Sequence, residues 1–196
     1  MKGDGIISFK SLQDFTEIVP FWFSPEVQPL WFEKNPEFDD SIRRLYGNTY
    51  QEVVKSLEGL DLDKLDVGLD EALALIILLD QFPRNMFRDK PEAFATDNLA
   101  LYLSKTISRK TFETELSSAA HYNFLYMPFM HSENLKDQEE GIRLFSCIPG
   151  NERTVSYAKL HWDIIALFGR FPHRNKILGR ASTAEEIEHL KEFQGF

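Results

Sequence analysis

The chain has 196 residues, of which 43% are hydrophobic and 27% charged, a composition that excludes a disordered protein and fits a folded globular one. This length predicts a single domain spanning 1–196 with a sizeable core. The formal net charge of -9 predicts a surface that repels nucleic-acid phosphates, so we expect no nucleic-acid partner.

The apolar segments are too short for a membrane protein. The longest apolar run, at 72–79, is far below the roughly 20 residues that cross a bilayer, and the segment MKGDGIISFK lacks the apolar stretch of a secretory signal. The single cysteine, Cys147, excludes an internal disulfide and lies in an apolar segment typical of a core. We therefore expect a cytoplasmic protein that contacts no membrane.

The first part of the chain carries clear helix signals. Ser11 and Asp14 resemble a capping box before a short helix, which Pro20 strains near its end. Asn35 and Pro36 predict the start of a longer helix, the first as its cap and the second as its first helical residue. The inward stripe of that helix comprises Phe38, Ile42, Leu45, Tyr46, Thr49 and Val53.

An acidic segment at 58–69 separates that helix from the next. Its alternating aspartates resemble a calcium loop but lack the required glycine and glutamate positions, so we expect a loop without calcium. Asp70 is expected to cap a helix of sequence ALALIILLDQF, whose continuous apolar run predicts burial on all sides. Pro83 disfavours helical geometry at Phe82, so we expect this helix to end there.

The remaining segments also show helical periodicity. Helices are predicted at 91–108, 116–131 and 135–148, the last with an inward face of Leu135, Gln138, Ile142 and Phe145. A further helix ends at Gly169 and turns inward Tyr157, His161, Ile164, Ile165 and Phe168. A last helix begins at Ser182, with Glu185 completing a capping box. No alternating pattern indicates a strand, so the expected fold is all-α, a compact bundle of helical hairpins with about seven to nine helices.

Two segments of the chain have similar sequences. LLDQFPRNMF at 78–87 and LFGRFPHRNKIL at 167–178 each end an apolar helix with Phe-Pro and then Arg-Asn. In a structural interpretation the proline stops the helix while Arg and Asn satisfy its free carbonyls. In a functional interpretation both segments line one site. The range 151–180 holds six Lys or Arg against two Asp or Glu, which favours a local anion site in an otherwise acidic protein.

The arginines of these segments leave two alternatives open. A guanidinium is a planar fork suited to carboxylate or phosphate, so Arg84, Arg170, Arg174 and Arg180 could clamp an acidic ligand if the fold gathers them. Alternatively, they pair with Asp80, Glu133 and Asp163 and lock helices together.

Histidines form the second candidate set. His121, His131, His161 and His173 lie near large apolar residues, and imidazole can act as acid, base or metal ligand near neutral pH. His131 with Glu133 in MPFMHSEN is the most suggestive pair. The chain has no HExxH, no Cys-x-x-Cys, no glycine-rich phosphate loop and no dinucleotide fingerprint, so we expect neither a metal nor a cofactor.

Several strings together resemble one family over nearly the whole chain, namely FWFSP, WFEKNPEFD, LIILLDQFPRNMFR, AFATDNLAL, FLYMPFMHSENL and FGRFPHRNKILGRASTAEE. They are similar to domain-of-unknown-function family 924, found mainly in bacteria. The resemblance implies an all-α, tetratricopeptide-like fold but no established reaction. The chain departs from the family pattern at Met130, where an acidic residue is expected, and at Pro20. The matching polar positions are Asp80, Gln81, Arg84, Asn85, His131, Glu133, His161, Arg170, His173, Arg174, Asn175 and Arg180.

Two functions follow as expectations. In the first, a pocket binds a small anionic ligand through Asp80, Gln81, Arg84, Asn85, Arg170, His173, Arg174, Asn175 and Arg180, and His131, Glu133 and His161 perform any proton transfer. In the second, the hairpins form a scaffold for a protein partner. The residues do not decide whether the protein is an enzyme.

Overall fold

The computed structural model describes residues 9, 12, 15–62, 65, 67–110, 116–193 and 195. In that part of the chain there are helices and turns but no strands, which confirms the all-α fold and the expected range of helices. The α-helices are α1 (Ile18–Trp22), α2 (Pro36–Leu57), α3 (Leu69–Ile76), α4 (Phe82–Met86), α5 (Asp97–Ser108), α6 (Ala119–His131), α7 (Leu135–Ser146), α8 (Glu152–Phe168) and α9 (Ala184–Glu192).

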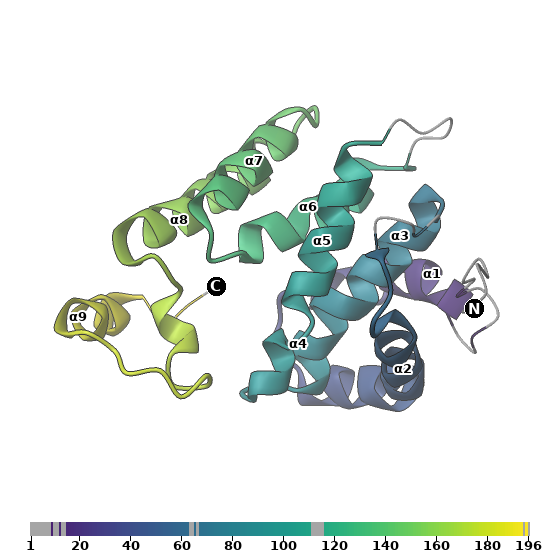
Figure 1. Ribbon diagram of the computed structural model, residues 1–196, viewed down its shortest axis with the longest axis horizontal. Coiled ribbons are helices and arrows are strands. Elements are labelled where there is room, and N and C mark those ends of the chain that lie inside the picture. The colour runs from purple at the N-terminus through teal and green to yellow at the C-terminus, as the bar shows by residue number, and fades with distance from the viewer. Residues whose placement is uncertain are drawn as a thin grey trace.

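The helices form one large core and two smaller apolar clusters. α1 to α6 form the large core around α3, whose apolar residues are buried, while α7 and α8 form a hairpin against α6, and α9 lies beyond the end of α8 (Figure 1). The C-terminal third rests on small clusters, one of which centres on Ile164, Ile165 and Phe171. Polar contacts therefore have a large share in holding this third in place. No helix in the described ranges is long and apolar enough to cross a membrane.

α2 begins as the sequence predicts. The Oδ1 atom of Asn35 accepts the backbone N–H of Phe38 at 3.0 Å, and Pro36 is the first helical residue. The expected stripe is buried except for Leu45, which is 45% exposed. The capping box expected at the first helix, Ser11 with Asp14, lies outside the described residues.

The helix expected to end at Phe82 instead continues through Pro83. α3 passes into a π-helical turn, Ile77–Gln81, in which the Phe82 N–H donates to the carbonyl of Ile77, and α4 follows without a break. Pro83 has no N–H for the carbonyl of Leu79, but the Thr96 hydroxyl donates to that oxygen at 2.6 Å. The predicted end is wrong because a side chain outside the helix replaces the missing hydrogen bond. Burial of 72–79 on all sides is confirmed.

Two predicted helix caps are wrong by one or two residues. Gly68 caps α3, and Asp70 lies within its first turn instead. Thr183, not Ser182, caps α9: its side chain accepts from the Glu186 N–H and the Glu186 carboxylate accepts from the Thr183 N–H. Glu186 therefore takes the place in the capping box that the sequence suggested for Glu185.

Four side chains expected in the core face outward. Besides Leu45, they are Leu135 at the first turn of α7, Tyr157 on α8 and Cys147, which is exposed at the end of α7. Helical spacing identifies a face but not where the neighbouring helix stops covering it, so residues at the ends of a packed face are misassigned.

α7 crosses close to α6 at Gly141, which leads to the first stability prediction. A Cβ atom on Gly141 would lie 2.9 Å from the Cβ of Phe129, whereas a Cβ on Gly47 in α2 would have no atom within 4 Å. Gly141→Ala should lower the free energy of unfolding by about 1–2 kcal/mol, because overpacking exceeds the gain in helix propensity. Gly47→Ala, the matched control, should raise it by about 0.5–1 kcal/mol. Urea denaturation of both variants measures the difference, and equal effects would contradict the close packing.

Candidate functional site

The two Phe-Pro segments, 78–87 and 167–178, both contact the carboxylate of Asp97. Asp97, the first residue of α5, accepts two hydrogen bonds from Arg84, from Nη1 to Oδ1 at 2.8 Å and from Nη2 to Oδ2 at 3.0 Å. Nη1 of Arg174 reaches Oδ2 of the same carboxylate at 3.3 Å. The fold therefore brings together the arginines of both Phe-Pro motifs, as the functional interpretation requires.

Asp80 and His131 form a buried pair beside them. The side chain of Asp80 is fully buried in the π-helical turn, and its Oδ1 accepts a hydrogen bond from Nδ1 of His131 at 2.8 Å. Nη1 of Arg84 lies 3.4 Å from the same Oδ1 and also donates to the Asp80 backbone carbonyl. Gln81 donates to the other carboxylate oxygen. Asp80 therefore holds the imidazole in one orientation.

The charges of this pair fix the protonation states. Burial alone would raise the pKa of Asp80, but Arg84 and His131 together bring that pKa well below its usual range. Burial, reinforced by Arg84, lowers the pKa of His131 despite the favourable contact with Asp80. At neutral pH the pair is therefore an ionised carboxylate and a neutral imidazole.

Glu133 and Arg180 form a second ion pair. Arg180 donates to both Glu133 oxygens, at 2.7 and 2.9 Å, and to the carbonyl of Phe171 at 3.1 Å. Glu133 in turn accepts the backbone N–H of Phe171 at 2.8 Å. Although burial raises the pKa of Glu133, the hydrogen bonds from Arg180 and Phe171 lower it overall. This set of contacts holds the loop after α8 against the end of α6.

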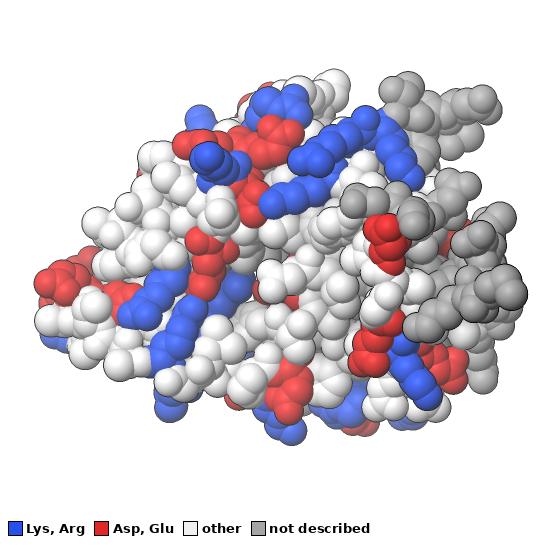
Figure 2. Space-filling model, viewed as in Figure 1, with Lys and Arg blue, Asp and Glu red and all other residues white. Residues whose placement is uncertain are grey.

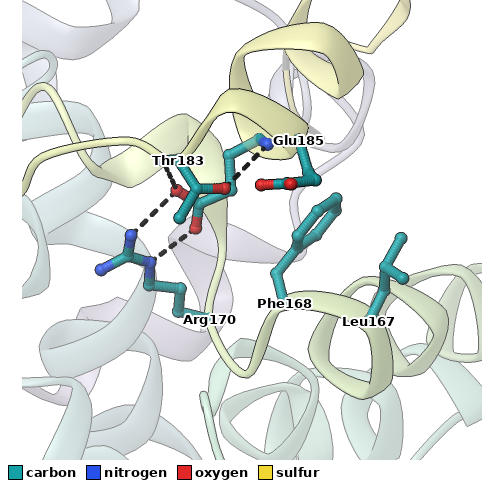
Figure 3. A pocket seen from close by; sticks show the side chains of 6 residues that line it. Leu167, Phe168, Arg170, Thr183 and Glu185 are labelled. Carbon is teal, nitrogen blue, oxygen red and sulfur yellow. Dashed lines mark hydrogen bonds and ion pairs between the residues drawn. The ribbon is translucent and has the colours of Figure 1, made fainter.

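Arg170 and Asn175 hold α9 in place through hydrogen bonds to Glu186. Arg170 donates to both oxygens of Glu186, at 2.6 and 2.8 Å, and Asn175 donates to the same carboxylate at 3.1 Å. Figure 3 shows this ion pair at the edge of a hollow of about 470 Å³ whose apolar wall is Leu167 and Phe168. The Arg170 guanidinium is already paired on the side of Glu186, so the hollow is not the charged pocket expected from the sequence.

Gln81 and Asn85 belong to the interior of the first six helices. Asn85 donates to Asp39 at 2.8 Å, and Arg88 donates to both oxygens of the same carboxylate. Gln81 contacts Asp80 and the sulfur of Met127. These two polar residues of the first motif tie helices together, which agrees with the structural interpretation for them.

Arg174 differs from the other arginines of the motifs. Its side chain is 8% exposed and lies between two aromatic rings, with the guanidinium carbon 4.7 Å from the ring centre of Phe94 and 4.6 Å from that of Phe171. It has one long hydrogen bond to Asp97, and its buried Nε, like that of Arg180, has no partner among the described residues. Burial, followed by the nearby charge of Arg84, lowers the pKa of Arg174 to about 10. Arg174 is thus a cation whose hydrogen-bonding capacity is only partly used.

Two further histidines lie beside Phe171, the ring on which Arg174 packs. The rings of His161 and His173 have centres 5.7 and 5.6 Å from that of Phe171. Burial lowers the pKa of His161 to about 3, with His131, Arg174 and His173 adding to the effect. Burial and Arg174 lower the pKa of His173 to about 4. The imidazoles beside Phe171, the ring on which Arg174 packs, are therefore neutral at pH 7.

The arginines and carboxylates of this region balance in number. Figure 2 shows blue and red side chains next to one another below the α7–α8 hairpin. The excess of positive charge in 151–180 is largely cancelled by partners outside that range, because Arg170 pairs with Glu186 and Arg180 with Glu133. Asp163, proposed as a partner for these arginines, is exposed. No group of three His, Cys, Asp or Glu among the described residues is placed to hold a metal ion.

Sequence reasoning missed three residues that organise the cluster, Phe94, Asp97 and Glu186. Asp97 follows Thr96 at a helix start, a pattern that indicates capping rather than an ion pair. Glu186 stands one position after the residue chosen for the capping box. Phe94 carried no sequence signal beyond being apolar.

The fold and this cluster define the class of protein, an all-α protein with a buried network of arginines, carboxylates and histidines. The model of a bacterial protein family of unknown function (DUF924) matches residues 18–194, so the chain belongs to this family. A protein of unknown function from Agrobacterium tumefaciens has a similar structure, with 34% sequence identity, a TM-score of 0.77, and coverage of 91% of this chain and 97% of that one. No curated protein matches the chain.

Proposed function

We propose that the protein binds a small oxyanion at Arg174. The observation that carries this proposal is the incomplete pairing of a buried arginine: Arg84, Arg170 and Arg180 each have two hydrogen bonds to one carboxylate, whereas Arg174 has one at 3.3 Å. A buried cation with unused donors is stabilised by an anion that completes its hydrogen bonds.

The surroundings of Arg174 suit such a ligand. Phe94 and Phe171 exclude water from the faces of the guanidinium, which strengthens its electrostatic interactions at the edge. The imidazoles of His131, His161 and His173 carry no charge at neutral pH, so they add no positive charge to the site. Attraction then comes from the unused donors rather than from a net positive charge.

Calorimetric titration with inorganic phosphate, sulfate and acetate tests the proposal. At least one of these anions should bind, and Arg174→Gln should weaken its binding by at least about tenfold, because a charge-assisted hydrogen bond contributes about 1.5–3 kcal/mol. Arg88→Gln is the matched control: Arg88 is also paired with a carboxylate, Asp39, but lies outside the site, and its variant should bind like the original protein.

Two results would overturn the oxyanion site. One is the absence of binding by all three anions at millimolar concentration. The other is equal weakening in the Arg174 and Arg88 variants, which would mean that binding responds to general loosening of the fold.

Two broader expectations stay predictions. Proton transfer by His131, Glu133 and His161 would make the oxyanion a substrate, and the Asp80–His131 pair is the arrangement that favours this role. A tetratricopeptide-like scaffold for a protein partner is the alternative, favoured by the exposed apolar side chains Tyr157, Leu160 and Leu167 on α8. A cytoplasmic location is likewise part of the proposal.

A further inference from the structure

We infer that the hollow between the end of α8 and the start of α9 binds an alkylammonium group, that is, a protonated amine carried on an aliphatic chain. The hollow has a volume of about 470 Å³ and is separate from the proposed oxyanion site, because Arg174 does not line it. The inference does not depend on the proposed function. It adds a second binding site, for a ligand of the opposite charge.

The apolar wall of the hollow consists of Leu167 and Phe168, the last two residues of α8. Leu167 is exposed, and Phe168 is half-buried, with its ring packed partly against the small C-terminal apolar cluster. The volume lies within the range of small-ligand sites, and a ligand that covers these two side chains removes apolar surface from water. An aliphatic chain therefore suits this wall.

The charged residues of the lining leave one negative charge unbalanced. Arg170 donates to both oxygens of Glu186, so these two charges cancel. The ion pairs of α9 in the described ranges are those of Glu186 and Glu188, and neither includes Glu185. The hydrogen bonds of the Glu185 carboxylate are to Thr183 and to its own backbone N–H, which are uncharged donors. The hollow therefore attracts a cation rather than an anion.

The unbalanced carboxylate and the aromatic ring face the same space. Both line the hollow, and in Figure 3 the Glu185 carboxylate reaches the side on which the Phe168 ring lies. An ammonium group there forms a charge-assisted hydrogen bond with the carboxylate and a cation–π contact with the ring. A hydroxyl group gains less from either partner, and a negatively charged ligand is repelled by Glu185.

The alkylammonium group has two natural sources, a free alkylamine and the lysine side chain of a partner protein. n-Butylammonium represents the first, and N-acetyl-lysine methylamide, which carries the same aliphatic chain on a peptide backbone, represents the second. Leu167 is 71% exposed, so the rim of the hollow is open to both. Equal affinity for the two probes would identify a lysine side chain as the source, whereas at least about tenfold weaker binding of the lysine derivative would restrict the site to free amines.

NMR titration of the full ¹⁵N-labelled chain with n-butylammonium, n-butanol and butanoate tests the site, because these probes share one chain and differ in charge. The amine should bind with a dissociation constant at least about fivefold lower than that of the alcohol, and butanoate should bind more weakly than the alcohol. The backbone amide signals that shift most should be those of Phe168, Thr183 and Glu185, which line the hollow.

Two variants show whether Glu185 is responsible. In Glu185→Gln the dissociation constants of the amine and the alcohol should differ by no more than about twofold. Glu188→Gln is the matched control: it changes another exposed glutamate of α9, which pairs with Lys191 and does not line the hollow, and should leave the preference for the amine unchanged.

Three results would overturn the alkylammonium site. One is the absence of shifts around the hollow at tens of millimolar amine. Another is equal binding of the amine and the alcohol to the original protein. The third is a preference for the amine that survives in Glu185→Gln, which would mean that this carboxylate serves only to stabilise the first turn of α9. The oxyanion site is tested separately, because Arg174→Gln should leave the binding of n-butylammonium unchanged.

Discussion

Replacing Asp80 with alanine should lower the free energy of unfolding by about 3 kcal/mol, because it leaves buried groups without their partner. His131 loses the acceptor for its Nδ1 hydrogen, and Gln81 loses an acceptor as well. Arg84 retains its two hydrogen bonds to Asp97, which keeps the loss below that of a fully isolated buried charge. Urea denaturation at pH 7 measures the change.

Two further variants make this prediction specific. Asp80→Asn preserves the size of the side chain and part of its hydrogen bonding, so its loss should be roughly half as large. Asp163→Ala removes an exposed aspartate from α8 and should change stability by less than about 0.5 kcal/mol. A loss below about 1 kcal/mol in Asp80→Ala would show that the buried pair contributes little to the fold.

Acidification from pH 7 to 5 should cost up to about 2 kcal/mol of stability for each of His161 and His173. Burial lowers their pKa values in the folded state, to about 3 and about 4, from the value near 6.5 of an unfolded chain. Between pH 6.5 and 4 the unfolded state binds more protons than the folded one. Stability is therefore complete above about pH 6.5 and falls as the pH decreases through this window.

The variant His161→Gln isolates one of these contributions. It should be less stable than the original protein at pH 7 but should lose about 2 kcal/mol less on going to pH 5. The carboxylates of Asp80 and Glu133 do not contribute to the stability change between pH 7 and pH 5, because their pKa values are lowered and they titrate below pH 5. An unchanged difference between pH 7 and pH 5 would mean that His161 is hydrated and titrates normally.

Helix content could be predicted well from the sequence, because its signals are local. The Asn35–Pro36 start, the buried run at 72–79 and the stop at Gly169 each depend on residues within one turn of the chain. The continuation through Pro83 could not be predicted, since it depends on the Thr96 hydroxyl, which lies 17 residues from the carbonyl that it satisfies.

The candidate site could be predicted only as a set of residue types. The similar sequences of the two Phe-Pro segments predicted that Arg84 and Arg174 lie close together, and both arginines contact Asp97. Which arginine keeps unused donors depends on the number of carboxylates that the fold brings to each one. Glu133, 47 positions before Arg180, accepts from both Nη atoms of that arginine, whereas Arg174 has one hydrogen bond, at 3.3 Å, to Asp97.

The π-helical turn marks the place where this helix can lose one residue without disturbing the network. A π turn holds one more residue than an α turn, and each residue of an α-helix is rotated by about 100° from the one before it. Five residues of a π turn and four residues of an α turn rotate the chain by nearly the same angle, so loss of one residue from Ile77–Gln81 would convert the π turn into an α turn and leave Arg84 facing Asp97. A deletion in α4 before Arg84 has no such turn to absorb it and would rotate Arg84 away from Asp97 by about 100°.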